Sequence, residues 1–178
     1  GLEVALGAGS DTLTYSTGVA GGAYGSVEIS ALSDSTVSSI DTLDFTGTTT
    51  TGLGTVAFDV GSSTFAATAQ LSTGGFVSGD AFSAAAGVTG SISTGGVMTV
   101  DKTFTSVATM AGYADAAASK AGSTVVFTNG EDAFLFIQGG ATGVADDYVA
   151  KIDAVSGVGL GLTIGGSAEQ ATVSFTVD

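Results

Sequence analysis

Alternation of apolar and polar residues runs through most of the chain and indicates β-strands. In residues 2–6, 13–15 and 27–29, apolar side chains alternate with small or polar ones. This alternation predicts strands with one buried face and one exposed face. The pattern returns in residues 43–45, 56–60, 160–164 and 172–177. Turns rich in Gly, Ser and Thr separate these stretches, as in an all-β fold.

A helical period interrupts the alternation once, and predicts a helix over residues 103–121. The apolar face of this helix contains Phe104, Val107, Ala108, Ala111, Ala114 and Ala118. Asp101 and Thr103 are suitable N-caps, and Lys120 with Gly122 favours a helix end.

The alternating period then resumes. Residues 125–127 and 133–137 predict a hairpin, with a Thr-Asn-Gly turn at 128–130 in which Asn-Gly suits a type I′ geometry. Residues 147–152 supply a third strand. Both faces of the 133–137 strand are apolar, so we expect it to be central in its sheet.

These elements predict a mainly β fold with two packed sheets and a single helix lying on one of them. A β-roll or solenoid-like arrangement of the N-terminal half is the alternative to a sandwich. We expect a domain boundary near residue 100, between a β-rich part (1–100) and a helix-plus-sheet part (101–178). One continuous domain is the alternative to this division.

The composition excludes most enzyme classes. The chain of 178 residues has no His, no Cys and no Trp, and its only bases are Lys102, Lys120 and Lys151. A Ser-His-Asp triad, a thiolate nucleophile and a His-ligated metal are therefore excluded, and we expect no enzyme activity.

The charge limits the partners. Seventeen acids against three bases give a net charge of −14. This charge repels nucleic acid and anionic membranes, and no apolar run is long enough to span a bilayer. It suits surroundings rich in divalent cations, where Ca²⁺ neutralises carboxylates.

One candidate calcium half-site is Gly7-Ala8-Gly9-Ser10-Asp11-Thr12-Leu13, which fits G-x-G-x-D-x-L. In the nonapeptide repeat of calcium-binding β-rolls, Gly7 and Gly9 would turn carbonyls toward the ion and Asp11 would supply a carboxylate. An ordinary Gly-rich turn with an Asx bond is the alternative.

Other candidate calcium ligands are acids placed at strand ends or beside glycine-rich loops. Hard cations prefer such oxygen ligands, and the alternative is that these acids are merely solvated. The candidates are Asp41, Asp44, Asp132, Asp146 and Asp147.

Residues 125–157, VVFTNGEDAFLFIQGGATGVADDYVAKIDAVSG, resemble the C-terminal module of bacterial repeats-in-toxin-related surface proteins. These are type I-secreted proteins that include S-layer proteins and large adhesins. The segments GAGSDTL and IDTLDFTG match more loosely. The resemblance implies secretion, an extracellular or cell-surface location, and calcium dependence.

We therefore expect an extracellular structural protein that self-assembles into a surface layer or filament. Strands at both ends, residues 2–6 and 172–177, would pair with neighbouring copies by strand addition. The alternatives are an adhesin-type module that binds cell-surface glycan, or a secretion or capping domain of a larger surface protein.

Overall fold

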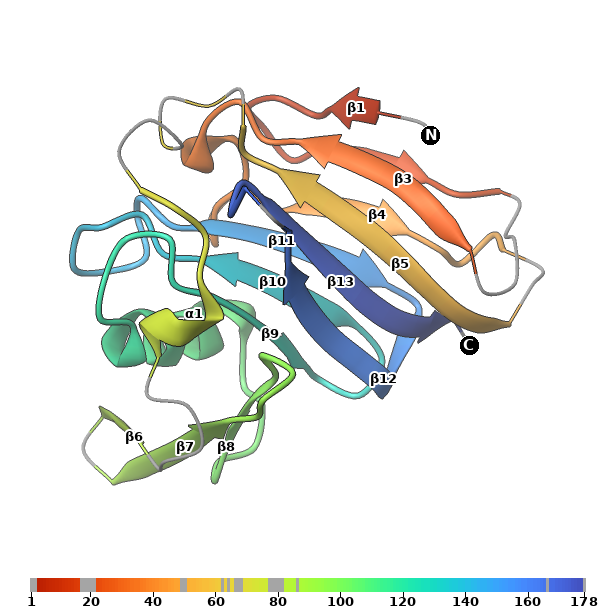
Figure 1. Cartoon of the computed structure of the whole chain (residues 1–178). Helices are drawn as coiled ribbons and strands as arrows, with labels where there is room; N and C mark the ends of the chain where they lie inside the picture. The colour runs from red at the N-terminus through yellow and green to blue at the C-terminus, as the bar shows by residue number, and fades with distance from the viewer. Residues whose placement is uncertain are drawn as a thin grey trace.

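A computed structural model of the chain contains two five-stranded sheets, a small third sheet and one α-helix among the described residues (Figure 1). The structure describes residues 3–16, 22–48, 51–61, 63, 65, 69–76, 82–85, 87–165 and 167–177. Leu2, in the first expected strand, lies outside this part. The predicted mainly β fold, with a helix on a sheet, is confirmed.

The two large sheets, called here sheet A and sheet B, face each other. In spatial order, sheet A contains β1 (Glu3–Ala5), β3 (Ala23–Glu28), β5 (Gly52–Asp59), β13 (Gln170–Val177) and β12 (Val155–Ile164). Sheet B contains β2 (Thr12–Thr14), β4 (Asp41–Asp44), β11 (Tyr148–Asp153), β10 (Ala133–Ile137) and β9 (Thr124–Thr128). The third sheet contains β6 (Phe82–Ala85), β7 (Val88–Ile92) and β8 (Met98–Val100).

The N-terminal half is a coil of parallel strands. From β1 to β5 the chain passes alternately between sheets A and B, and β1, β3 and β5 are parallel neighbours, as are β2 and β4. Val4 pairs with Val27, and Leu13 with Leu43. These intervals are longer than two nonapeptides, so the coil is solenoid-like without the tight repeat of a calcium β-roll.

The C-terminal half adds strands to both sheets, and they run antiparallel to their neighbours except where β11 lies parallel to β4. β13 pairs with β5 in sheet A, while β11 extends sheet B beside β4 and carries β10 and β9. Strands from both sides of residue 100 therefore share each of the two large sheets.

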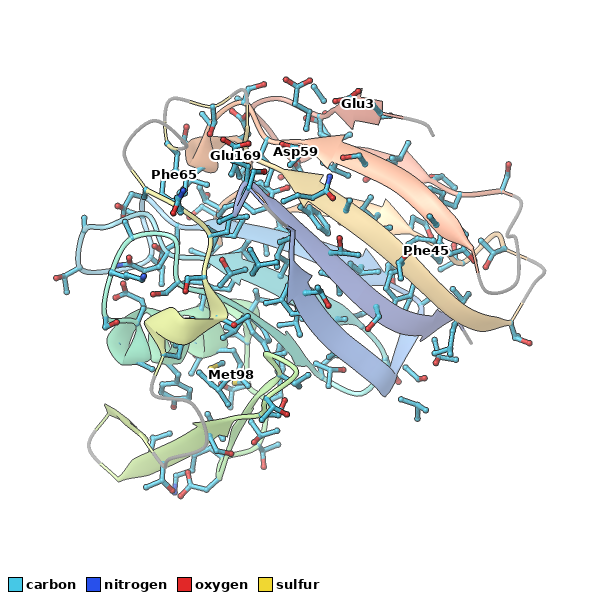
Figure 2. The ribbon with its side chains drawn as sticks, in the orientation of Figure 1. Glu3, Phe45, Asp59, Phe65, Met98 and Glu169 are labelled. Carbon is cyan, nitrogen blue, oxygen red and sulfur yellow. The ribbon has the colours of Figure 1, made fainter. Side chains whose placement is uncertain are left out.

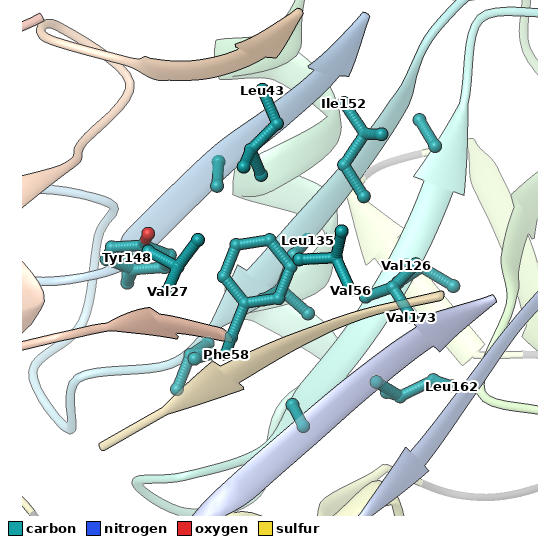
Figure 3. Packing of buried hydrophobic residues seen from close by; sticks show 14 of the residues in the cluster. Val27, Leu43, Val56, Phe58, Val126, Leu135, Tyr148, Ile152, Leu162 and Val173 are labelled. Atoms are coloured by element: carbon teal, nitrogen blue, oxygen red, sulfur yellow. The ribbon is translucent and has the colours of Figure 1, made fainter. Parts of the chain in front are cut away.

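Two apolar clusters hold the layers together. The larger one lies between sheets A and B and includes Phe58, Leu135 and Val173 (Figure 3). The other lies on the outer side of sheet B, under the helix, and includes Phe134 and Phe136. Successive side chains of β10 enter opposite clusters, which confirms that this strand is central and covered on both faces.

The helix α1 (Val107–Ala117) is shorter than predicted at both ends. Its N-cap is Ser106, whose Oγ accepts a hydrogen bond from the Thr109 backbone N–H at 3.1 Å. The expected cap Asp101 instead accepts bonds from Thr89, across β7 and β8. A small hydroxyl three residues before an open N–H satisfies the first turn, so the helix begins there.

The buried face of α1 also differs from the expected one. Met110, Ala111 and Ala114 are buried against sheet B, whereas Ala108 is exposed. The helix ends at Ala117, before Lys120 and Gly122, because Ala118 has extended backbone angles.

The predicted β9–β10 hairpin is confirmed, but the prediction of a type I′ turn is wrong. Four residues, Asn129 to Asp132, connect the strands, and Asn129 does not have the positive φ that type I′ requires. Its Oδ1 accepts hydrogen bonds from the backbone N–H groups of Glu131 and Asp132 at 2.9 and 2.7 Å. The Asn side chain therefore closes the turn by an Asx contact.

The expected role of residues 172–177 in strand addition is also wrong. These residues lie in β13, which is hydrogen-bonded to β5 on one side and to β12 on the other. Its inward side chains, including Val173 and Phe175, are buried. Neither edge is free, so this strand cannot add to a neighbouring sheet.

Candidate functional site

The two ends of the sandwich differ in how their edge strands are covered. β1 and β2 form the edges at one end, and β12 and β9 form the edges at the other. Glu3, labelled in Figure 2, lies on β1 at this edge of sheet A. Within the described part of the chain, β1 pairs only with β3, and β2 only with β4. We call this end the open end.

The opposite end is covered by segments before β9. The turn between β7 and β8 places the Gly95 carbonyl on the Leu162 N–H at 2.8 Å, and the Gly96 carbonyl on the Val126 N–H at 2.9 Å. The Ser72 carbonyl accepts from the Thr124 N–H at 3.0 Å. One edge N–H of β12 and two of β9 are therefore satisfied inside the chain, which hinders strand addition at these positions.

In each large sheet, inward-facing side chains that are in register on neighbouring strands form a row, which we call a column. Both columns end at the open end. In sheet A, Val4, Val27 and Phe58 are in register; Phe58 and Val27 are buried, whereas Val4 is half-buried. In sheet B, Leu13 is half-buried beside the buried Leu43. One further coil on this end would complete both columns.

A second candidate site is the loop between β10 and β11. The last residue pair of the two strands is Ile137 with Tyr148, so Gln138 and Asp147 stand opposite each other at the next position. Cross-strand neighbours of this kind share a face and lie within contact distance. Asp147 Oδ1 accepts a hydrogen bond from the Gly139 N–H at 2.8 Å, and the Asp147 side chain is fully buried.

Asp115 of α1 ties the helix to this loop. Its Oδ2 accepts from the Gly143 N–H at 2.8 Å, and its Oδ1 accepts from Gln138 Nε2 at 3.3 Å. Gln138 Nε2 also donates to the Ala141 carbonyl at 3.2 Å. Asp115, Gln138 and Ala141 line a hollow of about 320 Å³. The sequence analysis missed Asp115 and Gln138, although Asp115 is the lone charged residue of an alanine-rich helix.

Three acceptor oxygens in this loop have no hydrogen-bond partner: Gln138 Oε1, Asp146 Oδ1 and Asp147 Oδ2. Burial raises the pKa of Asp147 to about 7, helped by the negative charges of Asp115 and Asp146. Gly139 is required here, because a Cβ atom would meet the Asp146 carbonyl oxygen at 2.1 Å.

Asp11 and Asp41 also lie together, as neighbours on successive coils. The Asp11 N–H donates to Asp41 Oδ1 at 2.9 Å, and Asp41 is buried. Burial raises the pKa of Asp41 to about 6, with smaller contributions from the charges of Asp11 and Asp34. Gly7 and Gly9 have positive φ, so the backbone does turn before β2.

The remaining candidate acids have local partners. Asp44 Oδ1 accepts from the Thr46 N–H and Oγ1, and these bonds lower the pKa of Asp44. Asp132 forms an ion pair with Lys151 at 3.3 Å, and Lys151 also reaches Asp153. Both acids are thus engaged in local contacts.

The structure brings Asp11 close to Asp41, and Asp146 close to Asp147, while Asp44 and Asp132 stand elsewhere. No group of three or more Asp, Glu, His or Cys side chains suited to a metal ion occurs among the described residues. In that same part of the chain, no helix is long and apolar enough to cross a membrane.

Comparison with protein-family models, with curated proteins and with solved structures found no match to this chain.

Proposed function

We propose that this chain is an extracellular structural protein that self-assembles through β-strand pairing at its open end. The observation that supports this proposal is the pair of interrupted columns, which leaves Val4 and Leu13 half-buried beside fully buried neighbours in register. A partner coil buries both side chains and pairs the free edges of β1 and β2.

The covered opposite end determines the kind of assembly. Head-to-tail stacking would require two free ends and would give an open filament. Because Gly95 and Gly96 occupy edge groups of β12 and β9, strand addition joins two open ends and closes into a two-fold dimer. A layer or filament is then built from such dimers through other surfaces.

Charge makes this assembly depend on divalent cations. Each copy has a net charge of −14, and Glu3 and Asp11 are among the acids near the open end. Two copies repel each other unless counterions neutralise the carboxylates. Millimolar calcium, which the resemblance to type I-secreted surface proteins also implies, serves this purpose.

The test is sedimentation velocity of the wild type and of two matched Val→Asp variants, with calcium or with a chelator. Val4→Asp places a charge where the partner coil packs, and we expect it to remain monomeric in calcium. Val158→Asp alters an exposed residue on β12, at the covered end, and we expect it to dimerise like the wild type. Circular dichroism verifies that both variants fold.

Unimpaired dimerisation of Val4→Asp, or a wild type that stays monomeric in calcium, would argue against self-assembly through the open end. The second result favours another function, that of a capping domain at the end of a longer β-coil. The covering of β9 and β12 supports this second candidate, because a cap needs one closed end and one open end.

A further inference from the structure

The loop between β10 and β11 gathers oxygen atoms that nothing in the chain satisfies. Gln138 directly follows β10 and Asp147 directly precedes β11, and they are 7% and 0% exposed. Gln138 Oε1 and Asp147 Oδ2 lack hydrogen-bond partners, as does the buried Asp146 Oδ1 on the neighbouring residue. Buried polar atoms in native proteins are normally satisfied, so three orphaned acceptors in one loop require an explanation.

Asp115 fixes the direction of the Gln138 amide. Gln138 Nε2 donates to both Asp115 Oδ1 and the Ala141 carbonyl, so its Oε1 is the end of the amide left without a partner. Asp115 uses its other oxygen to hold the Gly143 N–H. It is therefore a positioning residue, while Gln138 and Asp147 present free oxygens.

Among the described residues, no lysine forms an ion pair with the acids of this loop. Lys120 lines the hollow together with Asp115 and Gln138, but it forms no ion pair with Asp115, Asp146 or Asp147. The negative charges of Asp115 and Asp146 add to the rise in the pKa of Asp147, and no lysine charge offsets them. An occupant must be cationic and must accept several oxygen ligands.

We infer that the loop between β10 and β11 binds one calcium ion, with Gln138 Oε1 and Asp147 Oδ2 as ligands. Asp146, loop carbonyls and water complete the coordination, since calcium takes six to eight oxygen ligands in flexible geometry. Two carboxylates among neutral oxygens agree with the absence of a three-acid group, and give the weak, millimolar affinity typical of extracellular sites. The inference rests on the calcium dependence included in the proposed function, and specifies where one ion binds.

The experiment is thermal unfolding with calcium, magnesium or chelator, in the Val4→Asp background so that dimerisation does not contribute. Calcium is expected to raise the unfolding temperature saturably at millimolar concentration, and magnesium to have little effect. Asp147→Asn should lower the calcium affinity at least about tenfold, because it removes a charged ligand. Asp41→Asn, at the other buried candidate acid, should respond to calcium like its parent.

A further variant, Gln138→Met, keeps the charge and most of the volume but removes the ligand oxygen, and we expect a several-fold loss of calcium affinity. If Asp147→Asn fails to fold, this variant decides. A parent protein indifferent to calcium, or equally stabilised by magnesium, overturns the site; so does a full calcium response in Asp147→Asn or Gln138→Met. Because all these proteins carry Val4→Asp, failure of the site is distinguishable from failure of assembly.

Discussion

Deleting residues 172–178 is expected to unfold the protein, not merely to prevent its assembly. The deletion removes most of β13, which pairs with β5 on one side and β12 on the other. It also removes the inward side chains of Val173, Phe175 and Val177, each at most 1% exposed. Burial of three such side chains stabilises the fold by roughly 5–8 kcal/mol. This is comparable to the total stability of a typical domain, about 5–15 kcal/mol.

Far-UV circular dichroism and urea titration of the deletion variant, with the wild type and a variant lacking only Asp178 as controls, measure this effect. We expect the single-residue deletion to unfold cooperatively like the wild type. The longer deletion is expected to show no cooperative transition. A folded deletion variant that dimerises normally would contradict the central position of β13.

Stability is expected to fall as the pH rises from about 4 to about 7 in the presence of a chelator. Asp41 and Asp147 have pKa values of about 6 and about 7 in the folded protein, against a normal 3.8, mainly because both are buried. The folded state therefore holds protons more tightly than the unfolded state. The stabilisation that each carboxyl contributes is complete below its pKa in the unfolded state. It is lost as the pH rises through its pKa in the folded state.

Between about pH 4 and about pH 7, the free energy of unfolding is expected to fall by about 2–4 kcal/mol, after allowing for relaxation around each charge. Acids with a lowered pKa, such as Asp44 and Asp101, affect stability at lower pH and leave this range unchanged. Urea unfolding at a series of pH values measures how steeply the free energy of unfolding falls with pH. An Asp41→Asn, Asp147→Asn double variant should lose most of this pH dependence. Equal slopes in the two proteins would show that neither carboxyl is responsible.

The elements predicted from local pattern are largely correct, because period and turn chemistry are local properties. The alternating pattern predicts the β9–β10 hairpin around Asn129. It also predicts that both faces of β10 are covered. The ends of the helix do not follow from the sequence, because the N-cap is Ser106 and neither Asp101 nor Thr103. Thr89 on β7, seventeen residues earlier in the chain than Ser106, engages Asp101 instead.

The pairing of strands could not be read from alternation. β1 and β13 alternate in the same way, yet β1 is an edge and β13 is internal. The difference arises from the coil, which returns the chain to each sheet beside its earlier strand. Parallel neighbours of this kind depend on contacts distant in sequence, which no local pattern specifies.

The candidate calcium residues were identified only in part for the same reason. Adjacent acids at Asp146 and Asp147 are visible in the sequence. Gln138 joins them through the β10–β11 register, and Asp115 through the docking of α1. Asp132 is engaged by Lys151, a partner that cross-strand geometry supplies.

The central claim is that copies join through the open end, and the absence of cysteine from the chain permits a direct test. Glu3→Cys places one thiol on the free edge of β1, and Val158→Cys places one on β12 at the covered end. Under mild oxidation in calcium, we predict disulfide-linked dimers of Glu3→Cys at far higher yield than of Val158→Cys. Chelator should abolish the difference, and equal yields of the two variants in calcium would contradict the claim.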